Sequence, residues 1–259
     1  PDATFAGAED VKFAHLTRDG FDVFFVSNQT EKPTDFVAQL RITGRKPELW
    51  SPMDGSVKPL HSFSQDANIT SVPMQLAPNE STFIVFAEPT DVHSASLDVT
   101  LNYPKADTLL TIATPWRLSL QTMLGESTKL TLKNLFDLTT STKPEIKYFA
   151  GTATYKTTFN APKAKSGHTY KIDLGQVYEM AKVKLNGRYI GGVWTPPYTL
   201  DVTPYLKTGR NELEVIVVNN WKNRIVGDLQ LPKNERRTSF THLSYGADTP
   251  LQPAGLIGA

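Results

Sequence analysis

The stretch of residues 183–220 constrains the fold of this 259-residue chain more than any other segment. Val183 and Leu185 alternate with lysines, which is the pattern of a strand that buries one face. Asn186-Gly187 comes next, and such a pair accepts the positive φ angles of a tight hairpin turn. A further alternating run, 212–218, follows a Thr-Gly-Arg-Asn turn. The segment therefore predicts antiparallel strands joined by short turns.

Short apolar runs bounded by turn residues continue through the rest of the chain. The 18 prolines and 16 glycines fall between these runs, as is typical of sandwiches and barrels. No long segment combines helical periodicity with caps, so we expect almost no helix, and residues 128–138 fit a strand as well as a helix. The predicted strands are 11–17, 21–28, 36–43, 70–76, 81–87, 129–135, 152–159, 170–174, 181–185, 188–193, 198–202 and 212–218, with a short strand at 98–101.

These strands form two groups, and the chain is long enough for each group to bury a core. We predict an all-β fold with two tandem β-sandwich domains, residues 1–104 and residues 105–259. The second group has seven or eight strands, which is enough for a complete sandwich. Residues 21–26 and 83–86 are apolar on both sides, which predicts central strands. The apolar tail that ends the chain is expected to pack back on the second domain.

The composition argues against several kinds of partner and chemistry. The net charge is +1 with Lys and Arg scattered along the sequence, so we expect no nucleic-acid partner. No apolar run approaches the roughly 18 residues of a membrane-spanning helix. The chain has no cysteine, which rules out disulfides and thiolate chemistry. It starts at Pro1 without a leader, which predicts a removed signal or a fragment of a longer protein.

Three sequence pieces together resemble the C-terminal region of glycoside hydrolase family 106, the α-L-rhamnosidases. They are FFVSN at 24–28 with ELWSP at 48–52, IKYFAGTATY at 146–155, and the segment 219–232 followed by 253–258. The order of strands and turns in residues 183–220 also resembles the galactose-binding-like sandwich of many glycoside hydrolases. The resemblance implies that the second domain is a galactose-binding-like jelly roll.

In that family the catalytic carboxylates and a metal site lie in an (α/β)-barrel that precedes the sandwiches, so the resemblance carries no catalytic residue over to this chain. It implies a non-catalytic accessory region that braces the catalytic barrel of the same polypeptide and contacts rhamnose-containing plant polysaccharide. It also implies a bacterial protein of the periplasm, the cell surface or the medium. A free-standing carbohydrate-binding module, or less favourably an independent glycosidase with an unrecognised site, are the alternatives.

Two clusters are candidates for carbohydrate binding, because aromatic faces stack on sugar rings and polar side chains bond their hydroxyls. Trp194 and Tyr198 flank a proline pair that stiffens their loop, although packing at the end of the sandwich is favoured for both. For the second cluster, binding and an interdomain clasp are equally supported, and its charged members are expected to pair. The second cluster consists of Asn219, Asn220, Trp221, Asn223, Arg224 and Asp228.

Only weak sequence patterns point to a catalytic site or a metal site. Glu212 and Glu214 share a strand face, but a solvated face explains them, whereas glycoside hydrolysis needs two carboxyl groups that face each other. The histidines show no ligand spacing. A structural Ca²⁺ is implied by the resemblance alone, and no other cofactor is predicted. The five histidines are at 15, 61, 93, 168 and 242.

Overall fold

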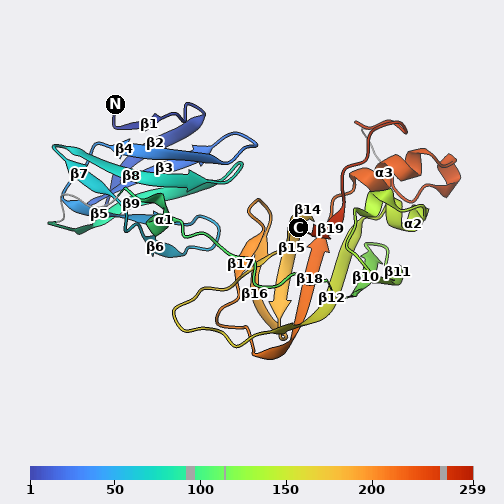
Figure 1. The fold of residues 1–259 in the computed structure, drawn as a ribbon. Helices are drawn as coiled ribbons and strands as arrows, with labels where there is room; N and C mark the ends of the chain where they lie inside the picture. Colours follow the sequence, from blue (N-terminus) through green and yellow to red (C-terminus); the bar gives the residue numbers. More distant parts are fainter. Residues whose placement is uncertain (92–96, 114, 240–243, 259) are drawn as a thin grey trace. The chain divides into compact units, whose positions relative to one another are not determined.

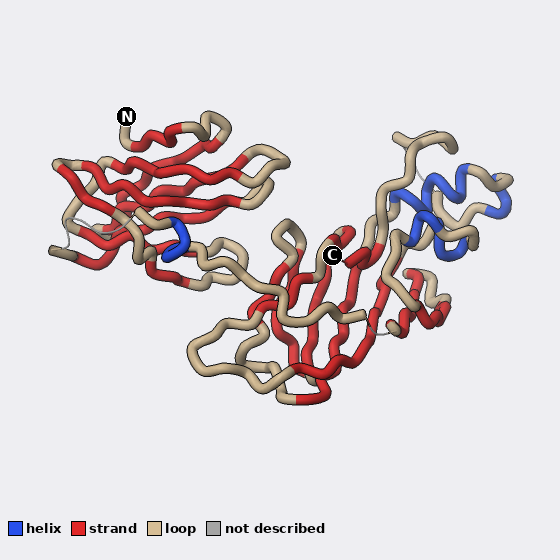
Figure 2. The backbone as a smooth tube through the Cα atoms, viewed as in Figure 1, coloured by secondary structure: helices blue, strands red, loops and turns tan. Residues whose placement is uncertain are grey.

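The computed structural model divides the chain into two compact units, Pro1–Thr108 and Leu109–Ala259. Residues 1–91, 97–113, 115–239 and 244–258 are described; His93 and His242, considered above, lie outside them. Strands dominate both units (Figure 1, Figure 2). Each unit encloses a hydrophobic cluster of its own. The predicted all-β fold with two tandem sandwiches is confirmed.

The first unit consists of a four-stranded sheet, β1-β4-β8-β7, and a five-stranded sheet, β2-β3-β9-β5-β6. Inward-facing side chains of both sheets, among them Phe24, Phe86 and Met74, form one buried cluster. The bounds are β1 (Ala3–Ala6), β2 (Val11–Arg18), β3 (Phe21–Asn28), β4 (Thr34–Leu40), β5 (Arg45–Trp50), β6 (Val57–Pro59), β7 (Ser64–Asp66), β8 (Ile69–Leu76) and β9 (Ser81–Pro89). As predicted, β3 and β9 are central strands, because each has a strand on both sides.

The predicted strand at 98–101 is wrong, because this segment is the short helix α1 (Val99–Asn102). The Asp98 carboxylate accepts a hydrogen bond from the Thr100 backbone N–H at 2.9 Å, which caps the helix. The helix ends in the fully buried Asn102, whose side chain accepts from Ser62 N–H at 2.8 Å and donates to the carbonyls of Ser62 and Pro73. The cap and this buried amide fix a helical turn where the apolar alternation alone favoured a strand.

The second unit is built on a six-stranded sheet, β11-β10-β12-β18-β15-β16, with two small sheets, β13-β17 and β14-β19. In Figure 1, β12, β18 and β15 lie side by side. Its strands are β10 (Trp116–Thr122), β11 (Ser127–Leu132), β12 (Gly151–Ala161), β13 (Lys171–Asp173), β14 (Gln176–Tyr178), β15 (Met180–Leu185), β16 (Arg188–Val193), β17 (Thr199–Asp201), β18 (Gly209–Val218) and β19 (Gly255–Gly258). Its helical segments are η1 (Leu138–Thr140), α2 (Pro144–Lys147), α3 (Lys222–Leu229) and η2 (Lys233–Glu235).

The predicted Asn-Gly hairpin joins β15 and β16. Asn186 and Gly187 have φ angles of 54° and 78°, the left-handed conformation that such a turn requires. The segment 128–138, which fitted helix or strand, forms β11 up to Leu132 and then leaves the sheet. Pairing with β10 through Trp116↔Leu132 explains the choice, because it places Leu132 in the core.

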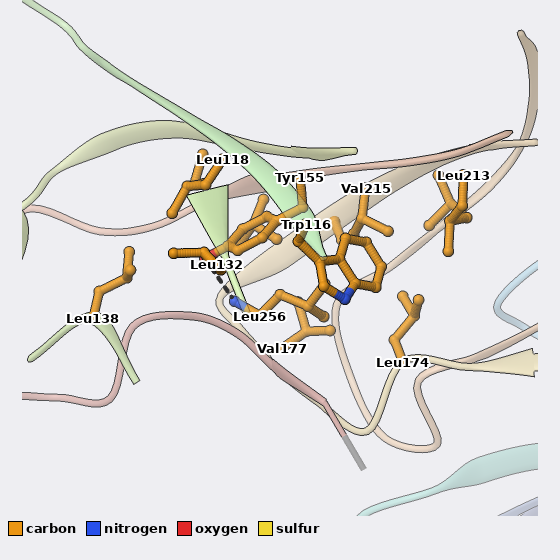
Figure 3. Packing of buried hydrophobic residues seen from close by; sticks show 14 of the residues in the cluster. Trp116, Leu118, Leu132, Leu138, Tyr155, Leu174, Val177, Leu213, Val215 and Leu256 are labelled. Carbon is orange, nitrogen blue, oxygen red and sulfur yellow. Dashed lines mark hydrogen bonds between the residues drawn. The ribbon is translucent and has the colours of Figure 1, made fainter. Parts of the chain in front are cut away.

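The core of the second unit surrounds Tyr155 of β12 (Figure 3). Its ring is fully buried and lies edge-on to Trp116, with ring centroids 6.5 Å apart. The Leu256 backbone N–H donates a hydrogen bond to the Tyr155 hydroxyl at 3.2 Å, and burial raises the pKa of this phenol to about 12. The tail therefore packs back on the domain as predicted, because β19 pairs with β14 and contributes Leu256 to the core.

Candidate carbohydrate-binding surfaces

The loop that follows β16 separates the two aromatic residues predicted there. Trp194 is 54% exposed, so the expectation that it packs at the end of the sandwich is wrong. Tyr198 is half-buried and packs on the core, and this burial raises the pKa of its hydroxyl. Because β16 is an edge strand, the residue that follows its end has a sheet neighbour on one side only. Trp194 alone presents an aromatic surface to solvent in this loop.

The second predicted cluster lies at the end of β18 and on helix α3, although the sequence predicts almost no helix. The Asn220 side-chain oxygen accepts from the Lys222 backbone N–H at 3.0 Å and thereby satisfies a free donor at the helix start. A Cβ at Gly227 would lie 2.5 Å from the ring of Tyr148, so the glycine lets α3 approach that ring. Tertiary contact therefore supports a helix whose sequence pattern is weak.

The three asparagines of this cluster are used for structural hydrogen bonds. Asn219 accepts from Gly151 N–H at 2.9 Å and donates to the Phe149 carbonyl at 2.8 Å. Asn223 exchanges two hydrogen bonds with the backbone of Gln252, at 2.6 and 2.8 Å. Asn220 donates to Glu179 at 2.5 Å and to the Gln252 side chain at 3.0 Å. These amides tie β12 and the tail to α3, and their bonding capacity is largely spent within the second unit.

Asp228 is the buried charge of the cluster, with 1% of its surface exposed. As predicted, it pairs with Arg224: Oδ1 lies 2.6 Å from the guanidinium, a charge contact without hydrogen-bond geometry. Its Oδ2 accepts from the backbone N–H groups of Arg237 at 3.0 Å and Thr238 at 2.8 Å, and from the Thr238 hydroxyl at 2.6 Å. Asp228 therefore anchors the segment after η2 to α3.

Trp221 and Arg224 are the two members of the cluster that line a pocket, of about 60 Å³. Trp221 is 43% exposed. Binding pockets for small molecules are typically about 300–1,000 Å³, so this one can hold part of a sugar ring but cannot enclose one. The other lining residues are Leu120, Thr122, Met123, Leu124, Glu126, Thr128, Glu145, Tyr148, Phe149, Ala150, Arg237 and Thr238.

The charged rim of this pocket consists of Glu126, Glu145 and Arg237 in addition to Arg224. It was not predicted, because these residues come from the β10–β11 hairpin, from α2 and from the segment after η2, which are far apart in the sequence. Arg237 donates a hydrogen bond to Glu126, and this contact holds the pKa of the Glu126 carboxyl below its usual range. A group kept ionised in this way can accept hydrogen bonds from sugar hydroxyls but is poorly suited to donate a proton. The pocket combines an indole, guanidinium groups and carboxylates, which is the chemistry of sugar recognition.

The two glutamates of β18 differ in their surroundings. Glu214 lies between two lysines, 2.5 Å from the ammonium of Lys156 and 2.8 Å from that of Lys184, and hydrogen bonds from both lower the pKa of its carboxyl. Glu212 is exposed on the same face. Within the described ranges, no group of three or more His, Asp or Glu side chains could hold a metal ion. The structural Ca²⁺ implied by the resemblance remains a prediction.

The comparisons with known proteins agree with this fold. Residues 1–65 match the family model of the glycoside hydrolase family 106 α-L-rhamnosidases, and residues 132–248 match that of the glycosyl hydrolase 2 galactose-binding domain-like family. The solved structure of a rhamnosidase from Novosphingobium sp. PP1Y matches 100% of this chain with a TM-score of 0.89 and 33% sequence identity. This chain resembles the family 106 α-L-rhamnosidases. The predicted resemblance, and the galactose-binding-like nature of the second sandwich, are confirmed.

Two curated proteins of Formosa agariphila also match parts of the chain. One, named "Putative beta-glucuronidase", is 49% identical over 94 residues, and the other, named "Beta-glucuronidase", is 33% identical over 78 residues. These matches cover 36% and 29% of this chain. The chain spans 8% of each of these relatives and 24% of the solved rhamnosidase. Its domains are thus related to those of glycoside hydrolases that are much longer than the chain.

Proposed function

We propose that this chain is a non-catalytic accessory region of an α-L-rhamnosidase-like glycoside hydrolase and that it braces a catalytic barrel of the same polypeptide. The observation that carries the proposal is the rhamnosidase match, which extends over 100% of this chain but only 24% of the matched enzyme. The chain thus corresponds to about a quarter of such an enzyme. In this proposal the accessory domains are residues 1–104 and 105–259.

Two further considerations support this assignment. Glu214 and Asp228, two carboxylates of the second unit whose side chains are mostly buried, are held in ion pairs with basic side chains. The resemblance to glycoside hydrolases also supports a bacterial protein of the periplasm, the cell surface or the medium. Among the described residues there is no helix of the length and apolar character that a membrane crossing requires.

The isolated chain is expected to release no aglycone from an aryl α-L-rhamnoside, while a longer polypeptide that includes the barrel hydrolyses it. Removal of residues 1–259 from that polypeptide should lower the unfolding temperature of the barrel, because the barrel loses its packing partner. Circular dichroism and cooperative unfolding verify that the isolated chain is folded. Turnover by the isolated chain that Glu126→Gln or Glu145→Gln abolishes would instead identify an independent glycosidase.

A second function, carbohydrate binding, is favoured by the exposed indoles of Trp194 and Trp221. Titration calorimetry with rhamnose-containing plant oligosaccharides should give saturable heat with the intact chain. Trp221→Ala is expected to lower the affinity about tenfold, the effect of losing one aromatic anchor. Trp194→Ala tests the other loop separately.

The matched control for these variants is Phe21→Ala, which removes a partly exposed aromatic ring from the first unit. This variant should bind oligosaccharide as the parent chain does. If the intact chain gives no heat, or if both tryptophan variants bind like Phe21→Ala, the carbohydrate-binding function is wrong and the bracing role alone is retained.

A further inference from the structure

The outer face of the six-stranded sheet carries a feature that the carbohydrate candidates above do not use. Alternate residues of its strands, such as Leu118, Tyr155, Val183 and Val215, point into the core. Because side chains alternate along a strand, the intervening residues all lie on the opposite face. Strands β11, β10, β12, β18 and β15 lie side by side in the sheet (Figure 1). Their register therefore decides which side chains meet on that face.

The register brings together five basic side chains that are scattered in the sequence. One row across the sheet pairs Lys184 with Glu214, Glu214 with Lys156, and Lys156 with Arg117. The adjacent row runs from Lys182 through Ile216, Thr154 and Ser119 to Lys129. We call these two rows the basic face; its basic members are Arg117, Lys129, Lys156, Lys182 and Lys184.

The basic face is strongly positive for a chain with a net charge of +1, because Glu214 is the single carboxylate in its two rows. Arg117, Lys129 and Lys182 are exposed. Strands lie about 4.8 Å apart and alternate residues of a strand about 7 Å apart. The cations therefore form an array of charges on the scale of neighbouring sugar units, not a single point site.

Glu214 gives part of this array a fixed geometry. Its carboxylate side chain is only 15% exposed and contacts two ammonium groups, on Lys156 and Lys184, each of which keeps 41% of its side-chain surface accessible. A lysine held in this way loses less rotational freedom when it binds a second anion, and the trio still carries one net positive charge. The face therefore presents oriented cations to solvent.

Tyr189 adds an aromatic surface at the edge of the basic face. It is opposite Lys184 in the β15–β16 pairing, which places both side chains on the outer face. A Cβ at Gly192 would lie 3.4 Å from the Tyr189 hydroxyl, so the ring extends along the strand over this glycine. The residue is nonetheless 59% exposed. An aromatic ring laid on a sheet beside lysines can stack on the apolar face of a sugar.

We propose that the basic face binds an acidic polysaccharide, with Tyr189 under one sugar ring and Lys182 and Lys184 at its carboxylate or sulfate groups. Lysine suits this role because its ammonium is a compact charge that bonds anions without a fixed orientation. The aromatic platform and the relation to glycoside hydrolases favour a glycan over a nucleic acid. The proposed site uses residues other than Trp194 and Trp221 and goes beyond the function proposed above.

Affinity electrophoresis of the 259-residue chain tests this inference with three polymers: polygalacturonate, dextran sulfate and neutral dextran. We expect retardation by one or both acidic polymers, weakened by salt, and none by dextran. Retardation by polygalacturonate alone would identify carboxylates as the recognised groups, and retardation by dextran sulfate alone would identify sulfates. Lys182→Glu should lower the affinity about tenfold, which corresponds to about 1.4 kcal/mol. Tyr189→Ala should lower it several-fold, whereas Tyr189→Phe retains the ring and should bind normally.

Lys163→Glu is the matched control, because it makes the same change of charge at an exposed lysine in the loop after β12. An equal loss for this variant, no binding of either acidic polymer by the folded chain, or equal retardation by dextran would overturn the inference. The inference would also be overturned if single-stranded DNA bound the chain as tightly as the acidic polymers and Tyr189→Ala did not change that binding. Loss of acidic-polymer binding in Trp194→Ala or Trp221→Ala would move the site to the earlier candidates. Rhamnoside turnover by the isolated chain would refute the accessory role without affecting this test.

Discussion

Replacing Asp228 with alanine is expected to lower the free energy of unfolding of the second unit by about 2–4 kcal/mol. The substitution leaves three donors, on Arg237 and Thr238, without their acceptor. It also removes the counter-charge of Arg224, whose side chain is 23% exposed, so water compensates that part of the loss. Urea unfolding followed by tryptophan fluorescence measures the effect, because three of the four tryptophans lie in the second unit.

Two variants make this result specific to the buried carboxylate. Glu235→Ala removes a negative charge from an exposed position on η2 and should leave the stability nearly unchanged. Asp228→Asn keeps one acceptor oxygen and should cost less than Asp228→Ala. If Asp228→Ala and Glu235→Ala unfold at the same urea concentration, the segment after η2 is held by other contacts and the anchoring role of Asp228 is wrong.

Gly255→Ala is expected to be the second large effect, with a loss of about 3 kcal/mol or more in the free energy of unfolding. The φ of Gly255 is +95°, which L-residues rarely adopt. A Cβ there would lie 2.4 Å from the Tyr155 hydroxyl and 3.0 Å from the side chain of Leu138. Because both groups belong to the packed core, neither can move away without disturbing it. Thermal unfolding of the intact chain should show the loss.

Gly125→Ala separates the two causes of this loss. Gly125 has a φ of +89° and no atom within 4 Å of an added Cβ, so this variant reports backbone strain alone. The excess loss at Gly255 over that at Gly125 measures the steric clash. Tyr155→Phe removes the hydroxyl and should recover part of this excess when it is combined with Gly255→Ala. Equal losses at the two glycines would contradict the packing of β19 on Tyr155.

The strands that the sequence predicted well are those with regular alternation and a clear turn. The hairpin β2–β3 is an example, since Asp19-Gly20 forms its turn with φ angles of 54° and 80°. Strands β6, β7 and β14 have three residues each, too few for a periodic signal. Helix α1 was missed because it depends on the side-chain cap from Asp98. Helix α3 was missed because it depends on the hydrogen bond from Lys222 N–H to Asn220 and on tertiary contact more than on helical periodicity.

The site was predictable only where its residues are neighbours in the sequence. The pairing of Arg224 with Asp228 follows from their separation by four residues, whereas the exposure of Trp194 depends on its position beyond an edge strand. The pocket rim with Glu126 and Arg237 and the basic face both depend on chain segments that only the sheet register brings together. A sequence in which lysines look evenly dispersed can therefore fold into a surface with a pronounced charge.

The pairing of β19 with β14 has a consequence for the order in which the two units fold during synthesis. The first unit takes its strands from residues 3–89, so its sandwich can close while the ribosome is still translating the second. The second unit must wait for Gly255–Gly258, because Leu256 fills the core beside Tyr155. Until that segment leaves the exit tunnel, the core beside Tyr155 lacks Leu256, and its apolar side chains stay open to solvent.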